Sequence, residues 1–406
     1  MSTGTRNLAL YRIAVFALFC MFFVVDASFR LRDFDDKSID FQVVIKFLVL
    51  FFTIGIGAIA LRYFRFYSRF LFVLPFFALM LISSIWSESL FFTLSIFFTF
   101  FSYFIFMVFF IDEYGLGKFS RIVTLSMFWF LVVSLLLYVF FPEMGRFSFW
   151  FNDVFAPSWR MSGLTTSANN FARVCGFFVL FLVGFNSIIK VQVGARFYNF
   201  CLILAAVCLL LSGSRTTIVV LLVSLSLYVF LQSNKQNKAL WISSVFCFGL
   251  ILALFSEELL QLVSRDGGDD ITSFTGRTFI WDAVLYFIDK KPVLGYGFGS
   301  SIFLLPEYAD ALGFTAAHAH NMYLQVMLSG GYVTLSVFLF LMLFCLYKSL
   351  KLNIAFVTSS LVFILLIGFF ESGAISLTAN MLTLLLFFNF YLIATPGICS
   401  SFRGEK

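Results

Sequence analysis

The sequence predicts an all-α, polytopic integral membrane protein with about 12 transmembrane helices and one large loop between the ninth and tenth of them. Its 406 residues are 61% hydrophobic and only 12% charged, and their mean hydropathy is +1.01. Soluble domains are about half apolar and about a quarter charged, and disordered chains have low hydrophobicity. The composition therefore excludes both classes, and residues 1–406 are expected to form a single membrane domain.

Each predicted span is an apolar stretch close to the ~20 residues that a helix needs to cross a bilayer. Two of these stretches are short and meet at Ser212-Gly213-Ser214, which predicts either a tight hairpin or a broken helix. The predicted spans are 8–25, 41–61, 70–86, 90–111, 121–141, 168–189, 197–212, 215–231, 239–256, 322–347, 354–370 and 376–395.

The Lys and Arg residues predict on which side of the membrane each loop lies, because cytoplasmic loops are enriched in these cations. More than half of the 27 Lys and Arg residues lie at the two termini and in one set of loops, where the only acids are Asp112, Glu113 and Glu405. This side, with both termini, is expected to be cytoplasmic. Its cations are Arg6, Arg12, Arg62, Arg65, Arg69, Lys118, Arg121, Lys190, Arg196, Lys235, Lys238, Lys348, Lys351, Arg403 and Lys406.

The opposite side receives every long loop, namely 26–40, 142–167 and 257–321. Loops as long as 257–321 are usually functional when they are ordered, and the aromatic residues spread through this loop favour order. The working face is therefore expected outside the cytoplasm. The net charge of +6 contains no basic run, so nucleic acid is not an expected partner.

Arg215 is the first candidate binding residue, because it opens an otherwise apolar helix at an outward turn. Ionisable residues in membrane spans are functional candidates, and a guanidinium offers a planar fork of donors to an anionic oxygen. The alternative is an arginine that only reaches the membrane surface.

Residues 278–289 are predicted to form an amphipathic helix at the outer membrane surface, because their apolar residues recur at helical spacing. Lys290 and Pro292 suit its end, and Arg277 lies at its start. Arg277 is a second candidate for binding an anion, with an ordinary solvated cation as the alternative. The following Gly295-Tyr296-Gly297-Phe298-Gly299 lacks the strand–helix context of a dinucleotide site and predicts a tight loop instead.

His318 and His320 are the only histidines of the chain, and both precede the tenth span. Histidine is the usual general base in proteins, so His320 is the candidate for that role, with His318 as a secondary candidate. Zinc binding is the weaker interpretation, because residues two apart do not share a helix face and no Cys set or HExxH accompanies them. The seven Cys residues show no CxxC pattern and lie almost entirely in apolar stretches, so no metal site is expected.

Four further residues are secondary candidates on the same side of the membrane. Arg173 falls just inside a predicted span, where an arginine needs a partner or an anionic ligand. Glu371, in the short last outer loop, is a candidate partner or second carboxylate. The other two are Arg160 and Asn321.

The order of these motifs resembles the bacterial O-antigen ligases and the related O-antigen and exopolysaccharide polymerases. That superfamily shows a Ser-x-Ser-Arg-like motif, an Arg-x-x-x-Trp helix, Pro-x-x-Gly-x-Gly and His-Asn-x-Tyr-Leu, in this order. The corresponding segments here are Ser212 to Arg215, Arg277 to Trp281, Pro292 to Gly299 and His320 to Leu324. The resemblance covers roughly residues 210–335 and the overall topology.

The resemblance implies glycan transfer at the periplasmic face of the bacterial inner membrane, without a metal or another cofactor. It implies a glycan on undecaprenyl diphosphate as donor. For this chemistry we expect Arg215 and Arg277 to bind the diphosphate, because guanidinium groups neutralise the charge that develops on it, and His320 to act as general base. The acceptor is another lipid-linked repeat unit in a polymerase, which is slightly favoured here, or lipid A–core in a ligase. A chain-length regulator protein is a further expected partner.

Two other classes of function are open at this point. A twelve-span transporter or lipid flippase would place functional charges near the bilayer midplane and would show two similar halves. The candidate residues instead lie at the outer boundary, and the two halves differ in loop length. A structural subunit of an envelope assembly would tolerate the loss of His320.

Overall fold

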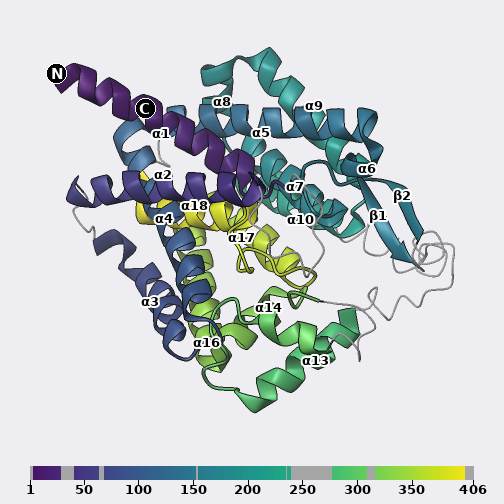
Figure 1. Cartoon of the computed structure of the whole chain (residues 1–406). Coiled ribbons are helices and arrows are strands. Elements are labelled where there is room, and N and C mark those ends of the chain that lie inside the picture. The colour runs from purple at the N-terminus through teal and green to yellow at the C-terminus, as the bar shows by residue number, and fades with distance from the viewer. Residues whose placement is uncertain are drawn as a thin grey trace.

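The computed structural model describes residues 3–28, 41–63, 68–151, 154–234, 236–238, 277–308 and 316–397 (Figure 1). The predicted span 239–256, most of the loop 26–40 and residues 257–276 of the largest loop lie outside the described residues.

The first part of the chain is helical except for one hairpin. Its elements are α1 (Thr3–Val24), α2 (Phe41–Tyr63), the 3-10 helix η1 (Ser68–Val73), α3 (Leu74–Ile82), η2 (Ser83–Ile85), α4 (Leu90–Tyr114), α5 (Leu116–Phe140), α6 (Pro142–Gly145), β1 (Arg146–Phe151), β2 (Val154–Met161), α7 (Ala168–Gly184) and α8 (Asn186–Val193).

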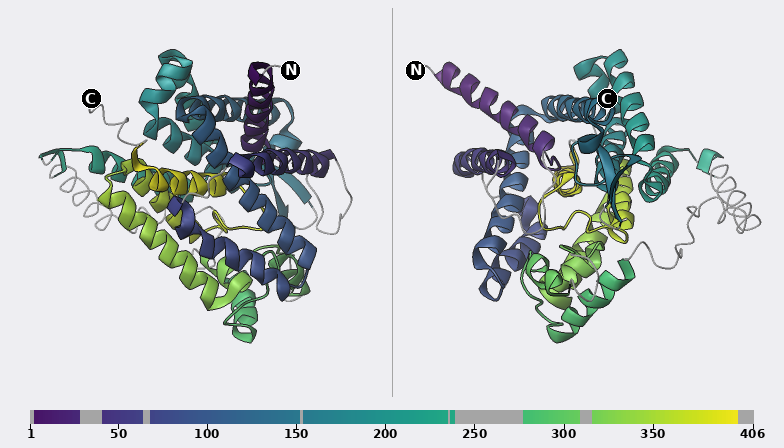
Figure 2. Two further views of the ribbon diagram at one scale, coloured as in Figure 1. Left: turned by 90° about the vertical axis from the view of Figure 1, so that its left-hand side faces the viewer. Right: turned by 45° about the vertical axis from the view of Figure 1, so that its right-hand side comes forward.

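The second part contains two long helices before the largest loop and three apolar helices after it. Its described elements are α9 (Ala195–Ser212), α10 (Arg215–Gln232), α13 (Arg277–Lys290), α14 (Ser301–Leu304), η4 (Leu305–Tyr308), α16 (Met322–Lys351), α17 (Ala355–Gly368) and α18 (Met381–Ala394). Figure 2 shows α13, in green, beside the lower end of α16.

Helical segments occupy every predicted span that falls within the described residues. Five of these helices are long and apolar enough to cross a membrane singly, and six qualify if the pair α7 and α8 counts as one span. The chain bends by 90° between α7 and α8, so the helix in the predicted span 168–189 is broken after Gly184. The structure supports an all-α membrane protein and leaves the twelve-span topology a prediction.

The hairpin of β1 and β2 is the main departure from an all-α fold. The two strands pair antiparallel, with Trp150 opposite Phe155 and an irregularity between Arg146 and Ser148. Aromatic residues favour strands, and this segment is rich in them. The hairpin lies within the predicted outer loop 142–167, and β2 contains Arg160.

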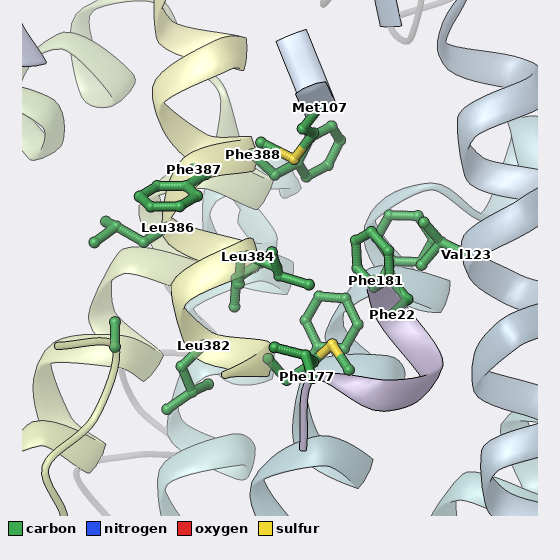
Figure 3. Packing of buried hydrophobic residues seen from close by; sticks show 14 of the residues in the cluster. Phe22, Met107, Val123, Phe177, Phe181, Leu382, Leu384, Leu386, Phe387 and Phe388 are labelled. Carbon is green, nitrogen blue, oxygen red and sulfur yellow. The ribbon is translucent and has the colours of Figure 1, made fainter. Parts of the chain in front are cut away.

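The core is built from phenylalanine rings that surround α18. This helix is apolar on all sides, and every residue from Met381 to Ile393 is buried, which is typical of a helix at the centre of a protein. The ring centroids of Phe388 and Phe119 are 5.1 Å apart, and those of Phe388 and Phe185 are 5.2 Å apart. Figure 3 shows Phe387, Phe388 and their neighbours packed in this way. Many of the Phe residues are therefore core residues and do not face lipid.

The glycine-rich loop after α13 docks on a break in α16. Gly330 and Gly331 are not helical, and Gly331 has φ 63°. The N–H groups of Tyr296 and Gly297 donate to the carbonyls of Leu328 and Ser329 at 3.0 and 2.7 Å. These bonds satisfy backbone groups that the break leaves unpaired, as an interrupted helix in a membrane requires. The glycine motif therefore attaches the end of α13 to α16.

Candidate functional site

Glu371 lies at the centre of a cluster of four polar side chains that are far apart in the sequence. Its Oε1 accepts hydrogen bonds from Arg277 Nη2 at 2.8 Å and from Asn169 Nδ2 at 3.2 Å. Its Oε2 lies 3.2 Å from His320 Nδ1. We call Glu371, Arg277, His320 and Asn169 the Glu371 cluster. Only 9% of the Glu371 side chain is exposed.

Tight packing against the start of α16 holds the Glu371 loop next to His320. Gly373 has φ 60°, and a Cβ added there would lie 2.8 Å from the sulfur of Met322. Glycine adopts this left-handed conformation without a steric cost and lets the methionine approach. Glu371 and the residues before α16 are thereby brought together.

His320 has an unusual backbone conformation at φ 46°. A non-glycine residue in the left-handed region costs on the order of 1 kcal/mol, and such strain clusters at functional sites. Its neighbour Ala319 is fixed on both sides, since the Ala319 carbonyl accepts from Trp281 Nε1 at 3.1 Å and its N–H donates to Gln325 Oε1 at 3.0 Å. One third of the His320 side chain, 33%, remains exposed.

The carboxylate of Glu371 fixes the tautomer of His320. Burial raises the pKa of Glu371, but the hydrogen bond from His320 and the charges of Arg173 and Arg277 outweigh burial, so the pKa lies well below its usual value. An ionised carboxylate only accepts hydrogen bonds, so the facing Nδ1 must carry a proton. In the neutral ring Nε2 is then the proton acceptor.

His318 stacks on His320, with ring centroids 4.1 Å apart. Burial, together with the charge of His320, lowers the pKa of His318 to about 3. A base of such low basicity is a poor proton acceptor at neutral pH. Among the two histidines, the environment thus favours His320 for proton transfer.

Asn321 and Tyr323 of the His-Asn-x-Tyr motif have structural contacts. The Asn321 side chain accepts from the N–H groups of Tyr323 and Leu324 and so caps α16, a contact worth about 1 kcal/mol. Its Nδ2 donates to the carbonyl of Phe369 at 3.2 Å, and the Tyr323 hydroxyl donates to Leu365. Asn321 therefore connects the His320 segment to the end of α17.

Helix α13 brings Arg277 to the Glu371 cluster. The helix covers the predicted amphipathic segment, and its apolar side packs against Leu304, Leu305 and Leu328. Phe279 is an apolar residue of this segment that does not join the packing, because 60% of it is exposed. With α13 docked in this way, Arg277 lies at its first turn and forms an ion pair with Glu371.

Arg160 is connected to the cluster through Asn169. It is buried, its Nε donates to the carbonyl of Ser212 at 3.0 Å, and its Nη2 donates to Asn169 Oδ1 at 2.8 Å. Asn169 lies in the first turn of α7. Sequence reasoning did not select Asn169, because its partner Glu371 lies 202 residues away.

Arg173 and Asp26 adjoin the cluster. Arg173 donates to Asn170 Oδ1, and its charge acts on Glu371, His318 and Asp26. Asp26 accepts from the N–H of Met381 at 2.7 Å, and burial raises its pKa despite the opposing charge of Arg173. The arginine that the sequence places inside a span thus has two carboxylates within electrostatic reach.

Arg215 is exposed at the start of α10. The preceding turn contains Gly213 with φ 60°, and the Ser212 carbonyl of this turn accepts from Arg160. Because Arg160 also donates to Asn169, it connects the turn that precedes Arg215 to Asn169 and Glu371. Helix α9 packs against α7 and α5, whereas α10 packs against α17 and α7.

His318, His320 and Glu371 present ligand atoms within 4.8 Å of one another, close enough to share a metal ion. The same carboxylate already accepts from Arg277 and Asn169, and Arg173 adds a second positive charge. Bound cations need neutralising ligands, and these arginines would repel a divalent ion. The geometry suits a hydrogen-bonded histidine better than a metal centre.

Two comparisons with known proteins bear on this site. The O-antigen ligase family matches residues 200–339, a segment that contains Arg215, Arg277 and His320 but ends before Glu371. A protein of Rickettsia felis named "Putative polysaccharide ligase" is 37% identical over 82 residues. That match covers 18% of this chain and 19% of the relative's length, so the chain is aligned to less than a fifth of that protein. These matches confirm the resemblance that the motifs indicated: residues 200–339 are similar to the O-antigen ligase family. The apolar helices indicate a membrane protein.

Proposed function

We propose that the protein transfers a glycan from undecaprenyl diphosphate to an acceptor hydroxyl at the periplasmic face of the bacterial inner membrane. Both termini would then be cytoplasmic. The single observation that carries this proposal is the partly exposed His320, held by the ionised Glu371 beside Arg277. It combines a proton acceptor with a cation that suits a diphosphate.

In the proposed reaction His320 is the general base. Its Nε2 takes the proton of the acceptor hydroxyl while the hydroxyl oxygen attacks the anomeric carbon of the donor. The bond from that carbon to the diphosphate oxygen breaks, and the electron pair leaves with undecaprenyl diphosphate. Glu371 stabilises the imidazolium that forms, as a carboxylate does behind a catalytic histidine.

Arg277 and Arg215 are the proposed diphosphate-binding residues. A guanidinium has five N–H donors, so the bond from Arg277 Nη2 to Glu371 leaves donors for a phosphate oxygen. Arg215 lies at the N-terminus of α10, where the helix dipole and the backbone N–H groups also favour an anion. Charge-assisted bonds of this kind stabilise the negative charge that develops on the leaving group.

The acceptor is proposed to be a second lipid-linked repeat unit, which makes the protein a polymerase, with a chain-length regulator as a partner. A ligase that transfers to lipid A–core is the second candidate, favoured by the descriptions of the matched family and relative. A transporter or lipid flippase is a remote alternative, because most of the charged candidates lie in or beside the Glu371 cluster.

Gel profiling of lipopolysaccharide from a deletion strain tests the proposal. Loss of a polymerase leaves single repeats on the lipid core, and loss of a ligase leaves none. Complementation with the wild-type gene should restore the ladder, and His320→Ala should not, although the variant reaches the membrane in equal amount. A normal ladder with His320→Ala would contradict the assignment of His320 and favour a structural subunit.

A further inference from the structure

We propose that Asn169 is a positioning residue for the His320–Glu371 pair and that Arg160 sets the orientation of its amide. The inference rests on the proposed function, because it assigns a role within the same site. Asn169 does not contact the reacting atoms in this account. It acts through Glu371.

The orientation of the Asn169 amide follows from its partners. A guanidinium only donates hydrogen bonds, so the atom 2.8 Å from Arg160 Nη2 must be the amide oxygen. The NH2 group then faces Glu371 Oε1 at 3.2 Å and donates to it. Arg160 thereby ensures that Asn169 presents a donor to the carboxylate.

Arg160 is itself held in place from two sides. Its Nε donates to the Ser212 carbonyl at 3.0 Å, and its guanidinium carbon lies 5.8 Å from the centre of the Phe147 ring. Because the residue is buried, its side chain has few alternative positions. A continuous path of hydrogen bonds therefore runs from the α9–α10 turn through Arg160 and Asn169 to Glu371.

The hydrogen bond from the Asn169 amide to Glu371 has a specific use when the lipid-diphosphate-linked glycan binds. Arg277 and Asn169 both donate to Oε1, while Oε2 faces His320. A diphosphate competes with Glu371 for the charged Arg277, but it has little electrostatic attraction for a neutral amide. Asn169 therefore keeps Glu371 in place, and Oε2 on Nδ1, while Arg277 turns to the substrate.

The substitution Asn169→Asp is the sharpest test, because it preserves shape and still accepts from Arg160 but replaces the donor to Glu371 with a carboxylate oxygen that repels it. We expect turnover per folded molecule to fall about 10- to 100-fold, the range for a lost hydrogen bond to a charged group. The KM for a lipid-diphosphate-linked glycan should change less than about twofold. Asn186→Asp, the same change at an exposed position in α8, is the matched control and should behave as wild type.

A double-mutant cycle separates positioning from general stability. In a Glu371→Gln background, adding Asn169→Ala should cost less than about threefold, because the residue through which Asn169 acts is already altered. Glu371→Asp is the second background and keeps the cycle measurable if Glu371→Gln turnover is very low. Equal losses in all backgrounds, or full turnover by Asn169→Asp, would overturn the inference. Failure of the proposed function looks different: the wild type transfers no glycan, or His320→Ala transfers it normally.

Discussion

Two carboxylates of this protein, Glu371 and Asp112, each accept a hydrogen bond from an arginine and contact a polar atom of an aromatic side chain. Asp112 accepts from Arg69 and, at 2.8 Å, from the Tyr391 hydroxyl. We call Asp112, Arg69 and Tyr391 the Asp112 cluster. The Asp112 cluster lies at the C-terminal end of α18, because Tyr391 is in the last turn of that helix, whereas Glu371 lies in the segment between α17 and α18.

The two clusters differ in what their rings can do. In the Asp112 cluster the ring is a tyrosine whose hydroxyl donates, and its residues lie in η1, α4 and α18. In the Glu371 cluster the ring is a histidine whose Nδ1 faces the carboxylate, which leaves Nε2 as the proton acceptor. This residue has a left-handed backbone, and one third of its side chain is exposed. An ion pair between an arginine and a carboxylate therefore does not by itself identify a functional site. The added proton acceptor, exposure and backbone strain distinguish the candidate site.

The largest expected difference between the two clusters comes from replacing their aromatic side chains, His320 and Tyr391. His320→Ala should lower glycan transfer about 10²- to 10⁴-fold, the usual contribution of a general base. Tyr391→Phe removes the matching contact in the Asp112 cluster and should leave turnover per folded molecule within about twofold of wild type. Rates measured with purified protein check both. Equal effects of the two substitutions would remove the distinction between the clusters.

Replacing the arginine in each cluster should have a smaller effect. Arg277→Lys keeps the charge but loses the planar fork of donors. Turnover should therefore fall about tenfold, which corresponds to the loss of one hydrogen bond, and the glycan donor should bind more weakly. Arg69→Lys is the matched change in the Asp112 cluster and should not alter donor binding. Arg277→Lys with wild-type KM and turnover would show that this arginine has no role in binding diphosphate.

The smallest effect concerns stability at low pH. The pKa of Glu371 is lowered in the folded protein, so its contribution to stability is complete above the ordinary pKa, about 4.5, and is lost as the pH falls through the folded value. As the pH falls below about 4.5, the difference in melting temperature between wild type and Glu371→Gln should change in favour of the variant. Glu143→Gln, at an exposed position, serves as the control. A difference independent of pH would contradict the ionised state of Glu371.

Local sequence patterns predicted those parts of the site that depend on a single segment. Apolar spacing predicted the helix that α13 forms, and the start of α10 coincides with Arg215. The 90° bend after α7 was not predictable from composition, because apolar residues continue through it and hydropathy carries no direction. The hairpin of β1 and β2 was not predicted, because residues 142–167 were interpreted as a loop between two spans.

The pairing within the site depends on tertiary structure. Arg277 and Glu371 lie 94 residues apart, and His320 and Glu371 lie 51 apart, so no local pattern links them. The sequence marked Glu371 only as a candidate partner, and the structure places it at the centre. Asn169 carried no signal, because an asparagine in the first turn of a helix is common and its role depends on both of its distant partners.

The most direct test compares the two carboxylates in one preparation. Turnover of a glycan on undecaprenyl diphosphate and the melting temperature are measured together for purified wild type, Glu371→Gln and Asp112→Asn. We expect Glu371→Gln to lose at least about tenfold in turnover per folded molecule, and Asp112→Asn to melt a few degrees lower with turnover unchanged. Unchanged turnover by folded Glu371→Gln would contradict the account, because the carboxylate that holds His320 would then be dispensable.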